Sequence, residues 1–141
     1  MAKINVEELP KAFDFKVNTM KTCLPSNGTD LSTPLAGSFE YCSYFVLVDA
    51  NQQKIITFIL NDAQTAARGV CVLTAQLIID QKVQTIITPE INSATLNILQ
   101  KAGIRIYLGT NGTLWENIDL FRDGRLVEVK IADLAKGVSK R

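Results

Sequence analysis

The chain of 141 residues, 47% of them hydrophobic, is long enough for one domain with a substantial buried core. Its 15 basic and 14 acidic residues leave a net charge of +1, which gives no strong field to attract nucleic acid. The absence of histidine excludes imidazole metal ligands, serine–histidine–aspartate triads and acid–base catalysis by imidazole.

The first half of the chain predicts strands. Residues 1–19 show no clean hydrophobic period, and we expect an N-terminal extension there. A short strand over 20–24, ended by a proline, leads into a long loop rich in Pro, Ser, Asn and Gly. Two runs rich in aromatic and β-branched residues, 43–49 and 54–60, flank a four-residue turn. They predict an antiparallel hairpin.

The second half changes to a helical period. A core-facing stripe is predicted from four residues at steps of three and four: Ala66, Val70, Leu73 and Leu77. A buried strand over 83–88, a helix over 93–102 and a strand over 104–109 follow. This order implies a right-handed parallel crossover.

The last predicted helix covers 113–121. Thr113 and Glu116 have the spacing of a capping box at its start, and Leu114, Ile118 and Phe121 should face the core. A short strand over 126–129 can follow before a basic tail.

The element order predicts an α/β fold of type βββαβαβα. We expect a mixed five-stranded sheet flanked by helices, similar to the ribonuclease H-like topology. The expected organisation is an extension at 1–19, one domain at 20–129 and a tail at 130–141. Ligands of such sheets tend to bind beyond the carboxyl ends of the parallel strands, here near 88–92 and 108–112.

Four segments of the chain match a known family in order. These are PSNG at 25–28, SFEYCSYFVLVD at 38–49, ARGVCVLTAQLIIDQKVQTIIT at 67–88 and LQKAGIRIYLG at 99–109. Residues 20–129 therefore resemble the dinitrogenase iron-molybdenum cofactor biosynthesis family, the NifX- or NafY-like carriers. The resemblance implies a non-enzymatic carrier or accessory protein that binds an iron–sulfur or molybdenum-containing cluster. Nitrogenase assembly proteins would be its partners.

The chain departs from the family pattern at the expected site. The histidine common in the family falls on Ser38, and the Gly-Arg that follows falls on Glu40-Tyr41. The loop that usually reads TGxxGPNA is 88–95 here, and it lacks the glycines that let backbone amides approach an anion.

The cysteines are the candidate metal ligands. Cys42 could replace the histidine, because a thiolate is a soft ligand for iron, copper or molybdenum–sulfur species; the alternative is a small buried hydrophobe. Cys71, near the start of a helix, could be a second ligand or part of the core. Cys23 in the first strand is expected to be buried scaffold. Wide, unequal spacings argue against a disulfide framework.

An anion could also be held by polar groups. Arg68 at a helix entry offers a guanidinium beside free amide donors, although a surface ion pair with Asp62 is the alternative. We expect Ser38, Cys42, Arg68, Cys71 and Asn92 to form the cofactor-binding set. The apolar runs are too short for membrane spans, and no signal-sequence pattern opens the chain, so we expect a cytoplasmic protein.

Other function classes remain open from the sequence. A protein-interaction or regulatory module that has lost cluster binding would fit the missing histidine and glycines. Phosphate binding at the loop 109–113 is a weaker alternative. A carboxylate-based nuclease centre is disfavoured, because Asp49 and Asp62 close strands at hairpin ends, where acidic residues serve turns.

Overall fold

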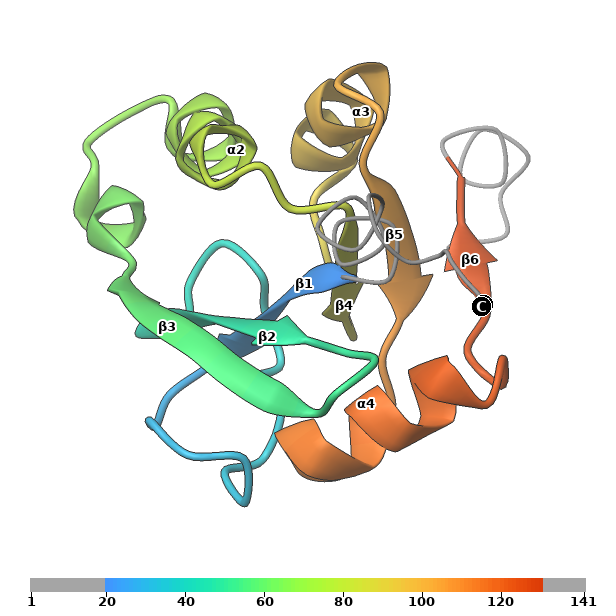
Figure 1. Cartoon of the computed structure of the whole chain (residues 1–141). Coiled ribbons are helices and arrows are strands. Elements are labelled where there is room, and N and C mark those ends of the chain that lie inside the picture. Colours follow the sequence, from blue (N-terminus) through green and yellow to red (C-terminus); the bar gives the residue numbers. More distant parts are fainter. Residues whose placement is uncertain (1–19, 131–141) are drawn as a thin grey trace, which may run out of the picture.

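The computed structural model describes residues 20–130, so the predicted extension and all but the first residue of the tail lie outside it. Six strands form one mixed sheet in the order β3-β2-β1-β4-β5-β6 (Figure 1). They are β1 (Lys21–Ser26), β2 (Tyr44–Asp49), β3 (Lys54–Leu60), β4 (Thr85–Thr88), β5 (Arg105–Leu108) and β6 (Glu128–Val129).

The expected five strands were one too few. Only two residues of the segment 126–129 form the sixth strand, in which Val129 pairs with Ile106 and Glu128 with Tyr107. This short antiparallel pairing gives hydrogen-bond partners to the free edge of β5. The likeness to the ribonuclease H-like topology stays a prediction.

The pairing of the remaining strands follows the sequence pattern. β2 pairs antiparallel with β1 and β3, which confirms the hairpin, and β4 pairs parallel with β1 and β5. β1 differs from the prediction because it continues through Pro25 to Ser26. The φ angle of proline suits an extended strand, and the Pro25 carbonyl accepts a hydrogen bond from the Ala36 amide at 3.0 Å.

Helices cover both faces of the sheet (Figure 1). α2 (Val70–Asp80) and α3 (Ser93–Lys101) lie side by side on one face, over a core that includes Phe39, Cys42 and Ile86. α4 (Leu114–Arg122) covers the other face. Within the described residues, none of these helices has the length and apolarity needed to cross a lipid bilayer.

The predicted buried stripe of α2 was wrong in part, because only Leu77 of its four residues packs against the core. A 3-10 helix, η1 (Asp62–Thr65), comes first, so Ala66 lies outside α2. The helix buries Thr74, Ala75 and Ile78, whereas Leu73 is 48% exposed. The sequence VCVLTAQLII is apolar on every side, and contact with α3 and the sheet therefore selects the buried face.

The last helix begins as predicted. Thr113 accepts a hydrogen bond from the Glu116 amide, and the Glu116 side chain accepts one from the Thr113 amide, so the capping box is confirmed. Leu114 and Ile118 are fully buried, and Phe121 is half-buried against the ring of Tyr107.

Several chain segments meet at one edge of the sheet. Ser26, Tyr44 and Leu60 are partners in register, so β1 and β3 end where β2 begins. β4 runs parallel to β1 and ends at the same edge, and α2 and α3 both begin there. We call this the carboxyl edge, and the opposite edge, where β1, β4 and β5 begin, the amino edge.

Candidate functional site at the carboxyl edge

The predicted rim, residues 38–42, folds against the loop between β4 and α3. The Phe39 amide donates to the Glu90 carbonyl at 3.1 Å, and the Phe39 ring is buried with its centroid 4.9 Å from that of Phe45. Ser38 beside it is half-buried. The rim is therefore anchored by a backbone hydrogen bond and by an aromatic side chain in the core.

The amino end of α3 is closed by the chain itself. The buried Glu40 carboxylate accepts a hydrogen bond from the Asn92 amide at 3.0 Å, and the Asn92 side chain accepts one from the Ala94 amide at 2.8 Å. A carboxylate is stabilised there by the positive end of the helix dipole. Glu40 thus occupies the position at which α3 would receive an external anion.

Cys42 is the last residue of the rim, and its side chain belongs to the buried core. Its side chain is 1% exposed, and its thiol donates to the Phe39 carbonyl at 3.4 Å. Burial is the main cause that raises the pKa of Cys42 to about 11. Cys23 is also buried, as expected for scaffold, and burial followed by the nearby Cys42 raises its pKa well above the usual value.

Asn61 was missed by the sequence analysis, although its position directly after β3 at this edge could have drawn attention. Its side-chain nitrogen donates to the carbonyls of Glu40 at 3.0 Å and of Cys42 at 2.9 Å, and lies 3.8 Å from the Cys42 sulfur. Its buried oxygen has no hydrogen-bond partner within residues 20–130. Asn61 therefore holds the rim over the thiol.

The amino end of α2 is open, in contrast to that of α3. Its N-cap is Gly69, at φ 71° in the left-handed region, and no side chain caps the first amides. Arg68 directly before it is exposed, and Cys71 in the first turn is half-buried. A guanidinium-bearing residue before α2 and a thiol in its first turn thus flank a helix start without a side-chain cap, and a helix start of this kind favours an anion.

The predicted set divides into two groups. Cys42 and Asn92 are linked through Asn61, which donates to the carbonyls of Cys42 and Glu40, and through the Glu40 carboxylate. Arg68 and Cys71 lie at the entry of α2. The two ion pairs within residues 20–130 do not include the expected pair of Arg68 with Asp62. Over the same residues, no three cysteine or acidic side chains gather as a metal site would require.

Three amides of the loop 109–113 donate to other groups of the protein, and that of Gly109 donates to the Thr88 carbonyl at 2.9 Å. The Thr110 amide donates to the Asn117 side chain at 2.8 Å, and the Thr113 amide donates to Glu116 at 2.8 Å.

Asp49 accepts a hydrogen bond from the Asn51 amide at 3.0 Å, which is the turn role expected for it.

A sequence profile and a protein sequence are similar to this chain. The profile, described as dinitrogenase iron-molybdenum cofactor, matches residues 20–124. An uncharacterized protein of Methanocaldococcus jannaschii is 30% identical over 113 residues, which span 79% of this chain and 92% of that protein.

Solved structures share the fold. The apo form of the orange protein from Desulfovibrio gigas has a TM-score of 0.73 at 21% identity, over 79% of this chain and 93% of that one. A proposed NifB protein from Thermotoga has a TM-score of 0.67 at 28% identity, over 77% and 92%. A candidate dinitrogenase from Methanocaldococcus jannaschii has a TM-score of 0.60 at 24% identity, over 79% and 96%. The resemblance seen in the sequence is confirmed, and the chain belongs to the dinitrogenase iron-molybdenum cofactor family.

Proposed function

We propose that this protein is a non-enzymatic carrier or accessory protein of nitrogenase cofactor assembly that binds an anionic metal–sulfur cluster at the carboxyl edge. The observation that carries the proposal is the open amino end of α2, flanked by Arg68 and Cys71, in a chain of this family. The name of one structural relative, a proposed NifB protein that is 28% identical, supports a place in the same assembly.

Each group at the α2 entry has a distinct role in this function. Arg68 supplies a positive charge and a fork of donors for cluster sulfur or oxygen atoms. The uncapped first amides of α2 add donors that need no rearrangement, and Cys71 supplies a soft thiolate ligand. Ser38 lies on the rim and Asn92 lies at the start of α3, so both residues border the carboxyl edge.

Cys42 would join as a metal ligand only after the rim opens. Raising its pKa from 9.0 to about 11 adds about 2 to 3 kcal/mol to the cost of forming its thiolate. Metal–thiolate bonds can exceed this cost, because metal binding displaces the proton. We therefore propose that the cluster docks first at α2 and then recruits Cys42 by lifting residues 38–42.

Anaerobic reconstitution tests this function. The full chain is incubated with sulfide and either iron, molybdate or copper, and visible charge-transfer bands are recorded. We expect a band that Cys71→Ser and Arg68→Gln weaken, whereas Lys101→Gln at the far end of α3 leaves it unchanged. Cys42→Ser should weaken the band without preventing docking. A wild-type protein that stays colourless with all three metals would contradict cluster binding.

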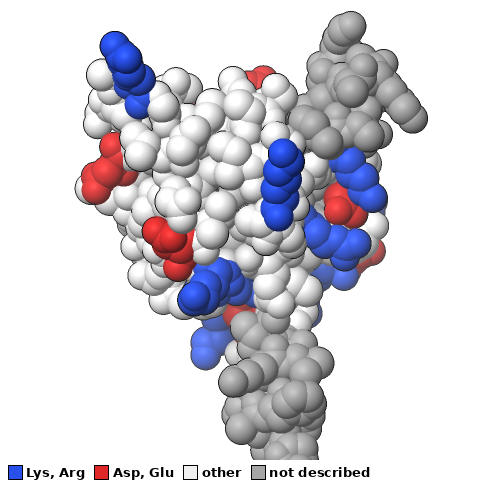
Figure 2. Space-filling model, turned by 90° about the horizontal axis from the view of Figure 1, so that it is seen from above, with Lys and Arg blue, Asp and Glu red and all other residues white. Residues whose placement is uncertain are grey.

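A second candidate function, a protein-interaction module, is favoured by one observation. Val72 and Leu73, in the first turns of α2, are 58% and 48% exposed. Figure 2 shows that the face seen from the side of α2 and α3 carries few charged groups across its centre. Apolar side chains on such a face are a feature of protein-binding surfaces.

Substitution of these two residues tests the second candidate. Purified nitrogenase assembly proteins are passed over the immobilised chain, and retention is compared between wild type and a Val72→Ser/Leu73→Ser variant. An interaction module should retain a partner only through the wild-type surface. Equal retention by both baits would count against it.

A further inference from the structure

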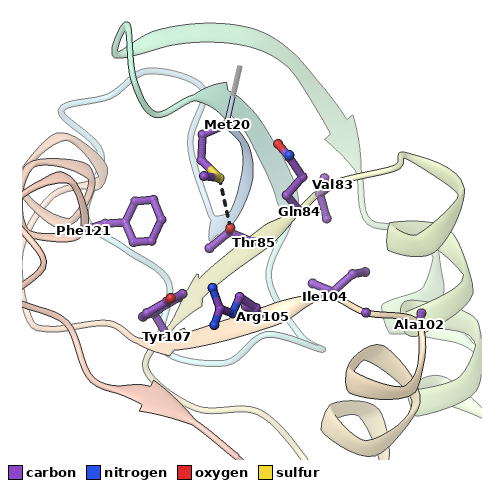
Figure 3. Close-up of a pocket in the computed structure, with 10 residues that line it drawn as sticks. Met20, Val83, Gln84, Thr85, Ala102, Ile104, Arg105, Tyr107 and Phe121 are labelled. Carbon is purple, nitrogen blue, oxygen red and sulfur yellow. Dashed lines mark hydrogen bonds between the residues drawn. The ribbon is translucent and has the colours of Figure 1, made fainter. Parts of the chain in front are cut away.

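A hollow lies at the amino edge, away from the rim, Glu40 and Cys42. It has a volume of about 390 Å³ and is lined by the starts of β4 and β5, the turn before β5 and Phe121 near the end of α4 (Figure 3). Pockets that bind small molecules usually measure roughly 300 to 1,000 Å³. This hollow therefore suits a ligand with a single ring.

Aromatic side chains form one wall of the hollow. Tyr107 and Phe121 have ring centroids 5.0 Å apart at an interplanar angle of 67°, an edge-to-face arrangement. Both rings are only half-buried and border the hollow in Figure 3. A planar ring in the ligand could extend this stack.

Arg105 provides positive charge beside the aromatic wall. It lies two residues before Tyr107 on β5, so both side chains stand on the same face of the sheet, and Figure 3 shows them next to each other. Among the residues that line the hollow, Arg105 is the only one with a formal charge. A planar guanidinium binds a carboxylate through two parallel hydrogen bonds.

The existing partner of Arg105 leaves room for a ligand. Its Nε lies 3.3 Å from Glu128, and the Arg105 side chain is 67% exposed. Such an exposed pair contributes only about 0 to 1 kcal/mol. A guanidinium also has more N–H donors than this single contact uses, so a second carboxylate can bind beside Glu128 or displace it.

Thr85 supplies a hydroxyl that lacks a strong acceptor. It is a register partner of Arg105 on the neighbouring strand and is buried. Within residues 20–130 its hydroxyl donates to the sulfur of Met20 at 3.5 Å, and a thioether is a weak acceptor. A carboxylate held by Arg105 on the same face would offer this hydroxyl a stronger one.

We infer that the amino-edge hollow binds a small monocyclic aromatic carboxylate. Arg105 and Thr85 hold the carboxylate, and the ring lies against Tyr107 and Phe121. The site is separate from the proposed cluster site, and its occupancy does not depend on metal binding at the α2 entry.

Benzoate serves as the probe in a nuclear magnetic resonance titration of the full-length, ¹⁵N-labelled chain. We expect benzoate to shift the amide signals of residues 83–85, 102–107 and 121. Benzamide, which keeps the ring without the charge, and acetate, which keeps the charge without the ring, should both bind more weakly.

Variants test the assigned contacts. Arg105→Gln should weaken benzoate binding by about tenfold, the expected loss of one charge-assisted contact. Glu128→Gln removes the competing carboxylate and should strengthen binding by up to about fivefold. Arg125→Gln, outside the hollow, is the matched control. The proposal is overturned if benzoate shifts no signals, if shifts cluster at the α2 entry, or if Arg105→Gln or benzamide leaves the affinity unchanged.

Discussion

Replacing Asn61 by alanine tests how the rim is held over Cys42. The amide donates to two buried carbonyls, those of Glu40 and Cys42, at 3.0 and 2.9 Å. Leaving a buried polar group unsatisfied costs about 1 to 3 kcal/mol. Alanine also removes the side-chain oxygen that has no partner within residues 20–130, and this offsets part of the loss. We therefore expect Asn61→Ala to lower the free energy of unfolding by about 2 to 3 kcal/mol.

Urea denaturation measures this loss through the transition midpoint at an unchanged slope. Asn97→Ala is the matched control, because Asn97 is half-buried on α3 and makes no hydrogen bond through its side chain within the described residues. Apart from the difference in helix propensity between asparagine and alanine, Asn97→Ala should change the free energy of unfolding by less than about 0.5 kcal/mol. Reaction of Cys42 with a thiol reagent should also accelerate in Asn61→Ala. A loss no larger than that of the control, with Cys42 still protected, would refute the role assigned to Asn61.

Three further predictions follow from the same contacts. Iodoacetamide should label half-buried Cys71 before the buried Cys23 and Cys42, as peptide mass spectrometry would show; early labelling of Cys42 would contradict its position. Burial raises the pKa of Cys42, so its contribution to stability is complete below pH 9.0 and is lost as the pH rises toward about 11. Urea denaturation at several pH values should show this loss of about 2 to 3 kcal/mol in the wild type and not in Cys42→Ala. The same dependence of stability on pH in both proteins would contradict the prediction. Gly109→Ala would place its Cβ against the Leu35 side chain and 3.3 Å from both the Ile87 side chain and the Thr88 backbone, and should lower thermal stability by about 1 to 3 kcal/mol. Gly37→Ala meets nothing within 4 Å. Equal melting temperatures would contradict that packing.

Local sequence patterns predicted most helices and strands, because these elements depend largely on interactions between residues close in the chain. The capping box of Thr113 and Glu116 identified the start of α4, and two runs rich in aromatic and β-branched residues around a turn identified the hairpin of β2 and β3. The sixth strand was not counted, because a two-residue strand has no periodicity of its own and forms only beside β5.

The candidate site depended more on contacts between distant segments. The sequence placed residues 38–42 near residue 92, but it did not indicate that Glu40 would occupy the start of α3 or that Asn61 would hold the rim. Uniform apolarity in α2 likewise hid which side would be exposed, so the exposure of Val72 and Leu73 was not predicted.

The sequence by itself determined the family, the type and order of most elements and the absence of imidazole chemistry, because these follow from residue identity and local spacing. Tertiary structure alone decided which thiol is accessible and which helix start is open. The physical reason is that burial and hydrogen-bond occupancy arise between segments far apart in the chain. Cys42 is buried below the rim backbone, and α3 is capped by Asn92, whose amide is bound by Glu40, whereas α2 keeps its first amides uncapped by any side chain.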